Sequence, residues 1–217
     1  MAKTKGNTNS ENQIVVMSKM DFEIATLVYK RLLEIGMTDE ELSFLLGKRN
    51  KYFFELLDPT EKNKFKTEQL DILPTILNTP IKKLVPNDLK PNETIKVGAV
   101  KKTYKSKIVY KYVIFLPDNT ESEPVTIIKK IEKGNRKKVN QEVHDFIIKQ
   151  IGNYSFNIPK NALELFLICK KGISTPFNPT DLQKSLATCC RDNGVHKPLL
   201  VKEIVNAKYV YTAINTK

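Results

Sequence analysis

The sequence predicts an α+β protein in which an N-terminal all-helical domain is followed by a small β-sheet and then by a helical domain that ends in a β-hairpin. Three observations lead to this class. Apolar residues recur at helical spacing between residues 20 and 86, they alternate with polar ones from about residue 95, and helical spacing returns at residue 139. A length of 217 residues with 41% hydrophobic content is enough to build such cores.

The predicted boundaries follow changes in composition along the chain. Prolines and asparagines between the helical and alternating segments cannot continue a helix, so that stretch is interpreted as a linker. The predicted parts are a disordered tail (1–19), a helical domain (20–86), a linker (87–94), a basic β-strand region (95–138) and a helical domain with a C-terminal hairpin (139–217).

Charge is distributed unevenly along the chain. The net charge is +12, and all of the excess lies after residue 94, which favours a polyanionic partner. No apolar run is long enough to span a bilayer and no hydrophobic signal core is seen, so we expect a cytoplasmic protein without a membrane partner. Three cysteines are too few for a disulfide framework, which indicates a reducing compartment.

The N-terminal helices carry local start and stop signals. A first amphipathic helix ends at Gly36, and Thr38 with Glu41 forms a capping box for a short second helix that Gly47 ends. A third helix is predicted from about Arg49 to Leu57. A fourth, with apolar residues at 70–77, and a short last one at 81–85 follow a polar loop.

These residues carry a resemblance to a known family. The runs MTDEELSFLLGKRNKYFFELLDP and FKTEQLDILPTILNTPIKKLVP resemble the helix-turn-helix domain of the lambda-repressor-like (XRE) family, over about 65 residues. The resemblance implies that the helix after Gly47 enters the major groove of double-stranded DNA, as part of a homodimer on a two-fold site. Acidic Asp39 or Glu40 stands where family members often have a polar amide, and one of the adjacent Phe53 and Phe54 must face outward. The alternative is a helix-turn-helix kept only for packing or dimerisation.

The candidate DNA-binding residues follow from the geometry of that motif. Arg and Lys suit guanine acceptors, Asn suits adenine, and lysines in the following loop suit phosphates. The candidate base-reading residues are Lys48, Arg49, Asn50, Lys51 and Glu55, and the candidate phosphate contacts are Lys62, Lys64 and Lys66.

The β-strand region provides a candidate second nucleic-acid surface. Its alternating segment has a basic polar side with tyrosines interleaved, a composition that suits phosphate and base contacts. The candidate residues here are Lys101, Lys102, Lys105 and Lys107, with Lys96 and Lys111 beside them and Tyr104, Tyr110 and Tyr112 between. The alternative is a solvated sheet that uses lysine to prevent edge-to-edge pairing.

The C-terminal elements follow the order helix, helix, helix, hairpin. This order resembles a winged-helix domain, in which the helix opened by Asn178 and Pro179 would be the reader. Its outward residues Gln183, Lys184 and Arg191 complete the second candidate surface. The alternative is a helical bundle whose hairpin, around Asn206 and Ala207, mediates dimerisation or contact with another protein.

Catalytic chemistry finds no support in the sequence. Adjacent Cys189 and Cys190 are poorly spaced for zinc, and His144 has no nucleophile beside it, so we expect no enzyme, no metal and no cofactor. The function predicted from these features is a DNA-binding transcriptional regulator, like a phage or mobile-element repressor. The alternative is an interaction or scaffold protein whose basic C-terminal part binds an acidic partner protein or RNA.

Overall fold

The computed structural model describes residues 11–61, 63–87, 92–115, 121–122, 124–130, 138–192, 194 and 197–214. Within these ranges the chain is a mixture of helices and antiparallel strands, so the predicted α+β class is confirmed. It divides into two compact units, and each draws on separate stretches of sequence. The first consists of residues 1–31, 54–74 and 78–136, and the second of 32–53, 75–77 and 137–217. The predicted helical domain of residues 20–86 is therefore not one compact unit.

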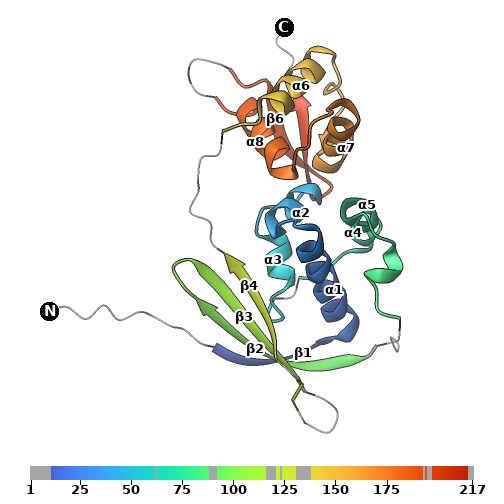
Figure 1. Ribbon diagram of the computed structural model, residues 1–217, viewed down its shortest axis with the longest axis vertical. Coiled ribbons are helices and arrows are strands. Elements are labelled where there is room, and N and C mark those ends of the chain that lie inside the picture. The colour runs from blue at the N-terminus through green and yellow to red at the C-terminus, as the bar shows by residue number, and fades with distance from the viewer. Residues whose placement is uncertain are drawn as a thin grey trace, which may run out of the picture. The chain divides into compact units, whose positions relative to one another are not determined.

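The first unit contains a four-stranded antiparallel sheet with the order β1-β2-β3-β4 (Figure 1). Its strands are β1 (Glu11–Ser18), β2 (Thr94–Thr103), β3 (Lys107–Phe115) and β4 (Val125–Lys130). The predicted disordered tail at 1–19 is wrong for residues 11–18, which pair with β2 along their whole length. Residues 1–10 lie outside the described residues.

One face of this sheet is buried against helices. Helix α1 (Lys19–Ile35) contributes Phe22, whose ring meets Tyr112 of β3 edge-on at 6.0 Å between centroids. Val97, Ala99 and Ile127 lie on the same buried face. Alternation then directs every second residue of each strand to the opposite face.

The predicted fourth helix is two short ones in the structure. They are α4 (Thr67–Leu70) and α5 (Leu73–Leu77), and a 3-10 turn, η1 (Ile81–Lys83), follows. Pro74 stands in the first turn of α5. Its ring has no N–H and would clash with the carbonyl of residue 70, so a continuous helix cannot form there.

The second unit combines α2 (Asp39–Leu45) with the C-terminal elements. These are α6 (Gln141–Gly152), β5 (Lys160–Asn161), α7 (Ala162–Gly172), α8 (Pro179–Cys189), β6 (Leu200–Val205) and β7 (Lys208–Ala213). The expected order of three helices and a hairpin is present, with β5 added to give a sheet of order β5-β7-β6. Asn178 caps α8 as the sequence predicted.

Candidate functional site

The predicted recognition helix is shorter than its sequence pattern suggested. Helix α3 comprises only Tyr52–Leu56, and the candidate base-reading residues from Lys48 to Lys51 form the turn before it. Gly47 has φ +69, a left-handed conformation that glycine adopts without strain. Because residues 48–51 are not helical, no helical turn presents their side chains to a groove.

The same turn is packed against the C-terminal hairpin and α8. The Lys48 ammonium donates a hydrogen bond to the carbonyl of Ala207, and the N–H of Tyr209 donates to the carbonyl of Gly47 at 2.8 Å. The Gln183 amide donates to Asn50 Oδ1 at 2.9 Å. Polar groups of two candidate base-reading residues, Lys48 and Asn50, are thus engaged in exposed hydrogen bonds within the second unit.

A buried carboxylate anchors α2 to α8 in this packing. Glu41 is 6% exposed, and its Oε1 accepts from the Thr180 hydroxyl at 2.9 Å. Its Oε2 accepts from the backbone N–H of Thr38 at 3.0 Å, which completes the predicted capping box. One side chain therefore caps a helix and holds a second helix at the same time.

The remaining candidates from the DNA hypothesis lie in dissimilar surroundings. Arg49 and Lys51 are exposed, whereas Glu55 is half-buried. Of the predicted phosphate contacts, Lys64 lies 3.9 Å from Asp21, Lys66 is exposed, and Lys62 lies outside the described residues. Of the candidates on α8 and beyond, Gln183 is engaged by Asn50, Lys184 is half-buried and Arg191 is exposed after the helix ends.

The expectation that Phe53 or Phe54 faces outward is wrong. Phe53 is fully buried and Phe54 is 6% exposed. The ring centroid of Phe54 lies 5.0 Å from that of Tyr110 on β3, and the ammonium of Lys129 on β4 lies over the Phe54 ring at 4.9 Å. The end of α3 is thereby packed onto the sheet of the first unit.

The lysines of the sheet do not share one face, contrary to the expectation from sequence. Lys101 lies on the side of Tyr110 and forms an ion pair with Asp58 at 3.2 Å. The Asp58 side chain is only 3% exposed, and it also accepts from the hydroxyls of Thr60 and Tyr110. Lys101 is therefore paired with a buried carboxylate beside α3, although half of its side chain remains exposed.

The Asp58 cluster holds its carboxyl ionised. Burial alone would raise the pKa of Asp58, but hydrogen bonds from Thr60 and Tyr110 and the charge of Lys101 outweigh it and leave the pKa below its ordinary value. Burial, with the charge of Asp58, raises the pKa of Tyr110 above its usual range. The Tyr110 hydroxyl accordingly stays protonated and donates.

The opposite side of the sheet, here named the outer sheet face, carries lysines and apolar side chains in alternation. The strand register aligns Val16, Lys96 and Phe115 in one row across the strands. The next rows are Ile14, Gly98 and Val113, then Val100, Lys111 and Thr126, then Lys102, Val109 and Ile128, and Lys107 follows at the hairpin end. The described residues of β2, β3 and β4 include no Asp or Glu.

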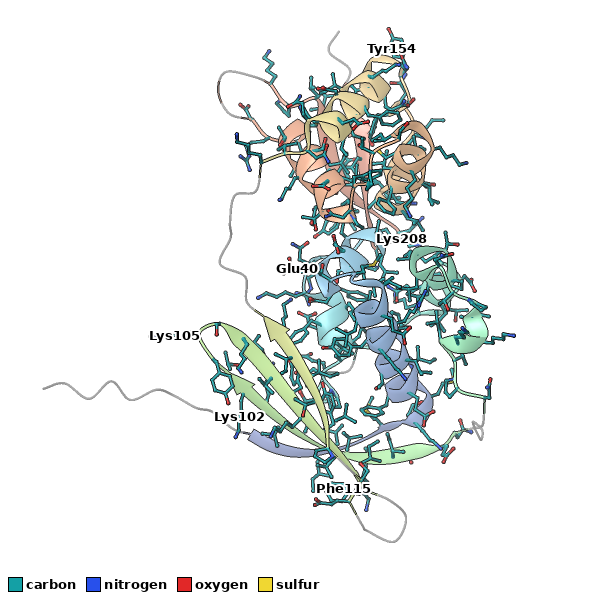
Figure 2. All side chains as sticks on the ribbon, in the orientation of Figure 1. Glu40, Lys102, Lys105, Phe115, Tyr154 and Lys208 are labelled. Atoms are coloured by element: carbon teal, nitrogen blue, oxygen red, sulfur yellow. The ribbon has the colours of Figure 1, made fainter. Side chains whose placement is uncertain are left out.

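Several apolar residues of the outer sheet face are exposed as well as its lysines, whereas Val109 is buried and Val100 and Val113 are half-buried. Ile14 is 68% exposed, Val16 62% and Ile128 46%. Figure 2 shows Lys102 and Lys105 toward the β2–β3 hairpin and Phe115 at the other end of β3. The surface is therefore both cationic and apolar along its length.

The tyrosines of this region are mostly withdrawn from the surface. Tyr110 and Tyr112 are 2% and 1% exposed, which corrects the expectation that they are available for base contacts. Tyr104 is 44% exposed, and the ammonium of Lys107 lies over its ring at 5.4 Å. Few rings thus remain on which an unpaired base could stack.

The cysteines lie in the core of the second unit or at its margin. Burial raises the pKa of Cys169 to about 12 and that of Cys189 to about 11, so both thiols stay protonated at neutral pH. Cys190 is half-buried. Among the described residues, no three His, Cys, Asp or Glu side chains are grouped so that they could hold a metal ion. No helix in the described part of the chain is long and apolar enough to cross a membrane.

Comparison with known proteins adds structural neighbours but no family. No family model and no curated protein matches the chain. Solved structures similar to it include CoII HppE in complex with substrate, at 20% identity and a TM-score of 0.29, covering 46% of this chain and 64% of that one. FeII HppE in complex with substrate is similar at 20% identity and a TM-score of 0.28, covering 44% of this chain and 59% of that one. The chain therefore spans less than two thirds of the length of either neighbour, and a similarity at this level assigns no activity.

The expected function as a DNA-binding transcriptional regulator is corrected by the geometry of the residues that were to read bases. Within this chain the turn that was to read bases is not helical, and Lys48 and Asn50 are engaged by Ala207 and Gln183. The resemblance to the lambda-repressor-like family stays a prediction about the N-terminal helices alone.

Proposed function

We propose that this chain is an interaction protein whose outer sheet face binds an acidic partner protein. The observation that carries the proposal is the row structure of that face, in which exposed lysines alternate with β-branched residues, some exposed and others half-buried or buried, and no acid intervenes in β2, β3 or β4. Charge complementarity selects an acidic partner and accelerates encounter, while the apolar positions supply contact area.

The mixture of side chains favours a protein over a nucleic acid. A phosphate backbone is bound best by arginine or by dense lysine, with aromatic rings for the bases. On this face Lys96, Lys102 and Lys111 are separated by valines, isoleucines and threonine, and Tyr110 and Tyr112 point to the buried side. An acidic segment with its own apolar residues can satisfy both kinds of position.

The test is a binding titration with a designed probe. A fluorescent peptide that alternates Glu and Val should bind the full chain more tightly than poly-glutamate of equal charge, because only the first offers apolar contacts. Reversing Lys96, Lys102 and Lys111 to Glu should weaken binding by roughly tenfold or more, since each exposed ion pair contributes about 0.2–1 kcal/mol and reversal turns attraction into repulsion.

A matched variant controls for net charge. Lys149, Lys170 and Lys171 are exposed on helices of the second unit, and their reversal to Glu changes the total charge equally. It should leave the affinity for the Glu–Val peptide within about twofold of the original at about 0.15 M salt, where distant exposed charges are screened. Equal losses in the two triple variants, or tighter binding of single-stranded RNA than of the peptide, would overturn the proposal.

A further inference from the structure

Strand β6 is an edge strand of the second unit. Among the described residues it pairs with β7 alone, because the order of the sheet is β5-β7-β6. An edge strand presents a row of backbone N–H and C=O groups that can accept another strand.

The turn that precedes β7 fixes which backbone groups face outward. Asn206 and Ala207 have φ of 49° and 59°, the conformation of a two-residue type I′ hairpin. The closing pair of such a hairpin, here Val205 and Lys208, exchanges both hydrogen bonds, and the pattern alternates along the strand. The N–H and C=O of Ile204 therefore face away from β7.

The side chains of β6 leave this edge uncovered. After Leu200 every residue of the strand is exposed, and Ile204 is 68%, Val205 44% and Val201 38% exposed. Edges are commonly guarded by lysine or proline. β6 has no proline, and the ammonium of Lys202 lies 3.6 Å from the centre of the Tyr209 ring, over the neighbouring strand.

We propose that a second copy of this chain pairs with β6, antiparallel, about a two-fold axis at Ile204. β6 carries one Lys and one Glu, so its net charge is zero and it attracts neither an acidic nor a basic partner. An axis at Lys202 or at Glu203 would set like charges directly opposite each other, which is destabilising. An axis at Ile204 places isoleucine against isoleucine and uses the outward N–H and C=O of that residue in both copies.

This inference does not depend on the acidic partner of the outer sheet face, which lies in the first unit. It is tested by sedimentation equilibrium of the full chain over a concentration series, with the variants Ile204→Pro and Ile204→Val. The original chain should reach a dimer and stop there. Ile204→Val keeps the N–H and a β-branched side chain, and its dimer dissociation constant should lie within about twofold of that of the original chain. Ile204→Pro removes the outward N–H, which β7 does not use, and should weaken the dimer by about tenfold or more.

A folding measurement and a substitute variant keep the outcome decisive. Circular dichroism shows whether the proline variant folds, and if it does not, Ile204→Lys replaces it, because it opposes two ammonium groups across the axis and should weaken the dimer similarly. A chain that stays monomeric at every concentration, a dimer that persists in a folded proline or lysine variant, or oligomers that grow beyond two would each overturn the proposal.

Discussion

Each unit holds one of its helices in place by a different kind of contact. In the first unit the end of α3 is fixed to β3 by buried groups: Tyr112, 1% exposed, hydrogen-bonds the carbonyl of Leu57, and Phe54 packs on Tyr110. In the second unit α2 and the turn after it are hydrogen-bonded to α8 and the hairpin, for example from Thr180 to Glu41 and from Gln183 to Asn50, and apolar side chains of α2 are buried as well.

The two kinds of contact contribute different amounts to the free energy of unfolding. Burial of large aromatic side chains contributes several kcal/mol, whereas a hydrogen bond that replaces one to water contributes about 0.5–1.5 kcal/mol. We therefore expect the buried aromatic contact of the first unit to tolerate substitution poorly and the hydrogen bond between α2 and α8 in the second unit to tolerate it better. Substitutions at Tyr112, Asp58 and Glu41 should accordingly lower stability in that order, from most to least.

The largest effect is expected at Tyr112. Tyr112→Ala leaves a cavity between α1 and the sheet and removes the donor to Leu57, so it should lower the free energy of unfolding by about 3–5 kcal/mol. Urea unfolding followed by circular dichroism measures it. Tyr104→Ala, at an exposed position, is the control and should change the value by less than about 0.5 kcal/mol. Similar losses in the two variants would contradict the buried attachment.

An intermediate effect is expected at Asp58, and it depends on pH. The pKa of Asp58 in the folded chain lies below its ordinary value of 3.8, so the folded state favours the ionised form. Its contribution is complete above the ordinary pKa and is lost as the pH falls through the lowered folded pKa. Asp58→Asn should cost about 1.5–3 kcal/mol at neutral pH and flatten this acid limb.

Urea unfolding of the Asp58→Asn variant at a series of pH values checks this. Asp71→Asn, at an exposed position, provides the comparison and should preserve the acid dependence. If the Asp58→Asn and Asp71→Asn variants lose stability in parallel as the pH falls, the cluster of Thr60, Tyr110 and Lys101 does not hold the carboxylate ionised.

The smallest effect is expected at Glu41. Glu41→Gln keeps the shape but weakens the cap on Thr38 and the bond from Thr180, at a cost of about 0.5–2 kcal/mol. A double-mutant cycle with Thr180→Val isolates the contact between helices, and we expect a coupling of about 0.5–1.5 kcal/mol. Glu68→Gln, at an exposed residue, is the control. A coupling near zero would mean that the two helices do not depend on this bond.

Local signals in the sequence predicted much of the fold. Thr38 with Glu41, Gly47 and Asn178 mark helix ends because their effect is on the backbone within one turn, and the structure shows each of them in that place. Strand β1 was missed, since its partner β2 is far along the chain, as the pairing of Ser18 with Thr94 shows, and neighbouring polar residues obscured its alternation. Pairing between such distant segments leaves no local mark.

The site was predicted less well than the fold. Lys101 and Lys102 were placed on one surface, yet consecutive residues of a strand must point to opposite faces, and this rule alone could have separated them. The same rule places Tyr110 and Tyr112 opposite Lys111. The bond between Glu41 and Thr180 joins residues 139 positions apart, and neither residue type signals it.

A methyl NMR titration of the full chain with the Glu–Val peptide tests the central claim most directly. Val100, Val113 and Ile128 lie on the outer sheet face, whereas Val97 and Ile127 lie on the buried face of the same strands. We predict that the methyl signals of the first three shift on binding and that those of the other two change little. Shifts spread equally over both sets, or confined to methyl groups of the second unit, would contradict binding at the outer sheet face.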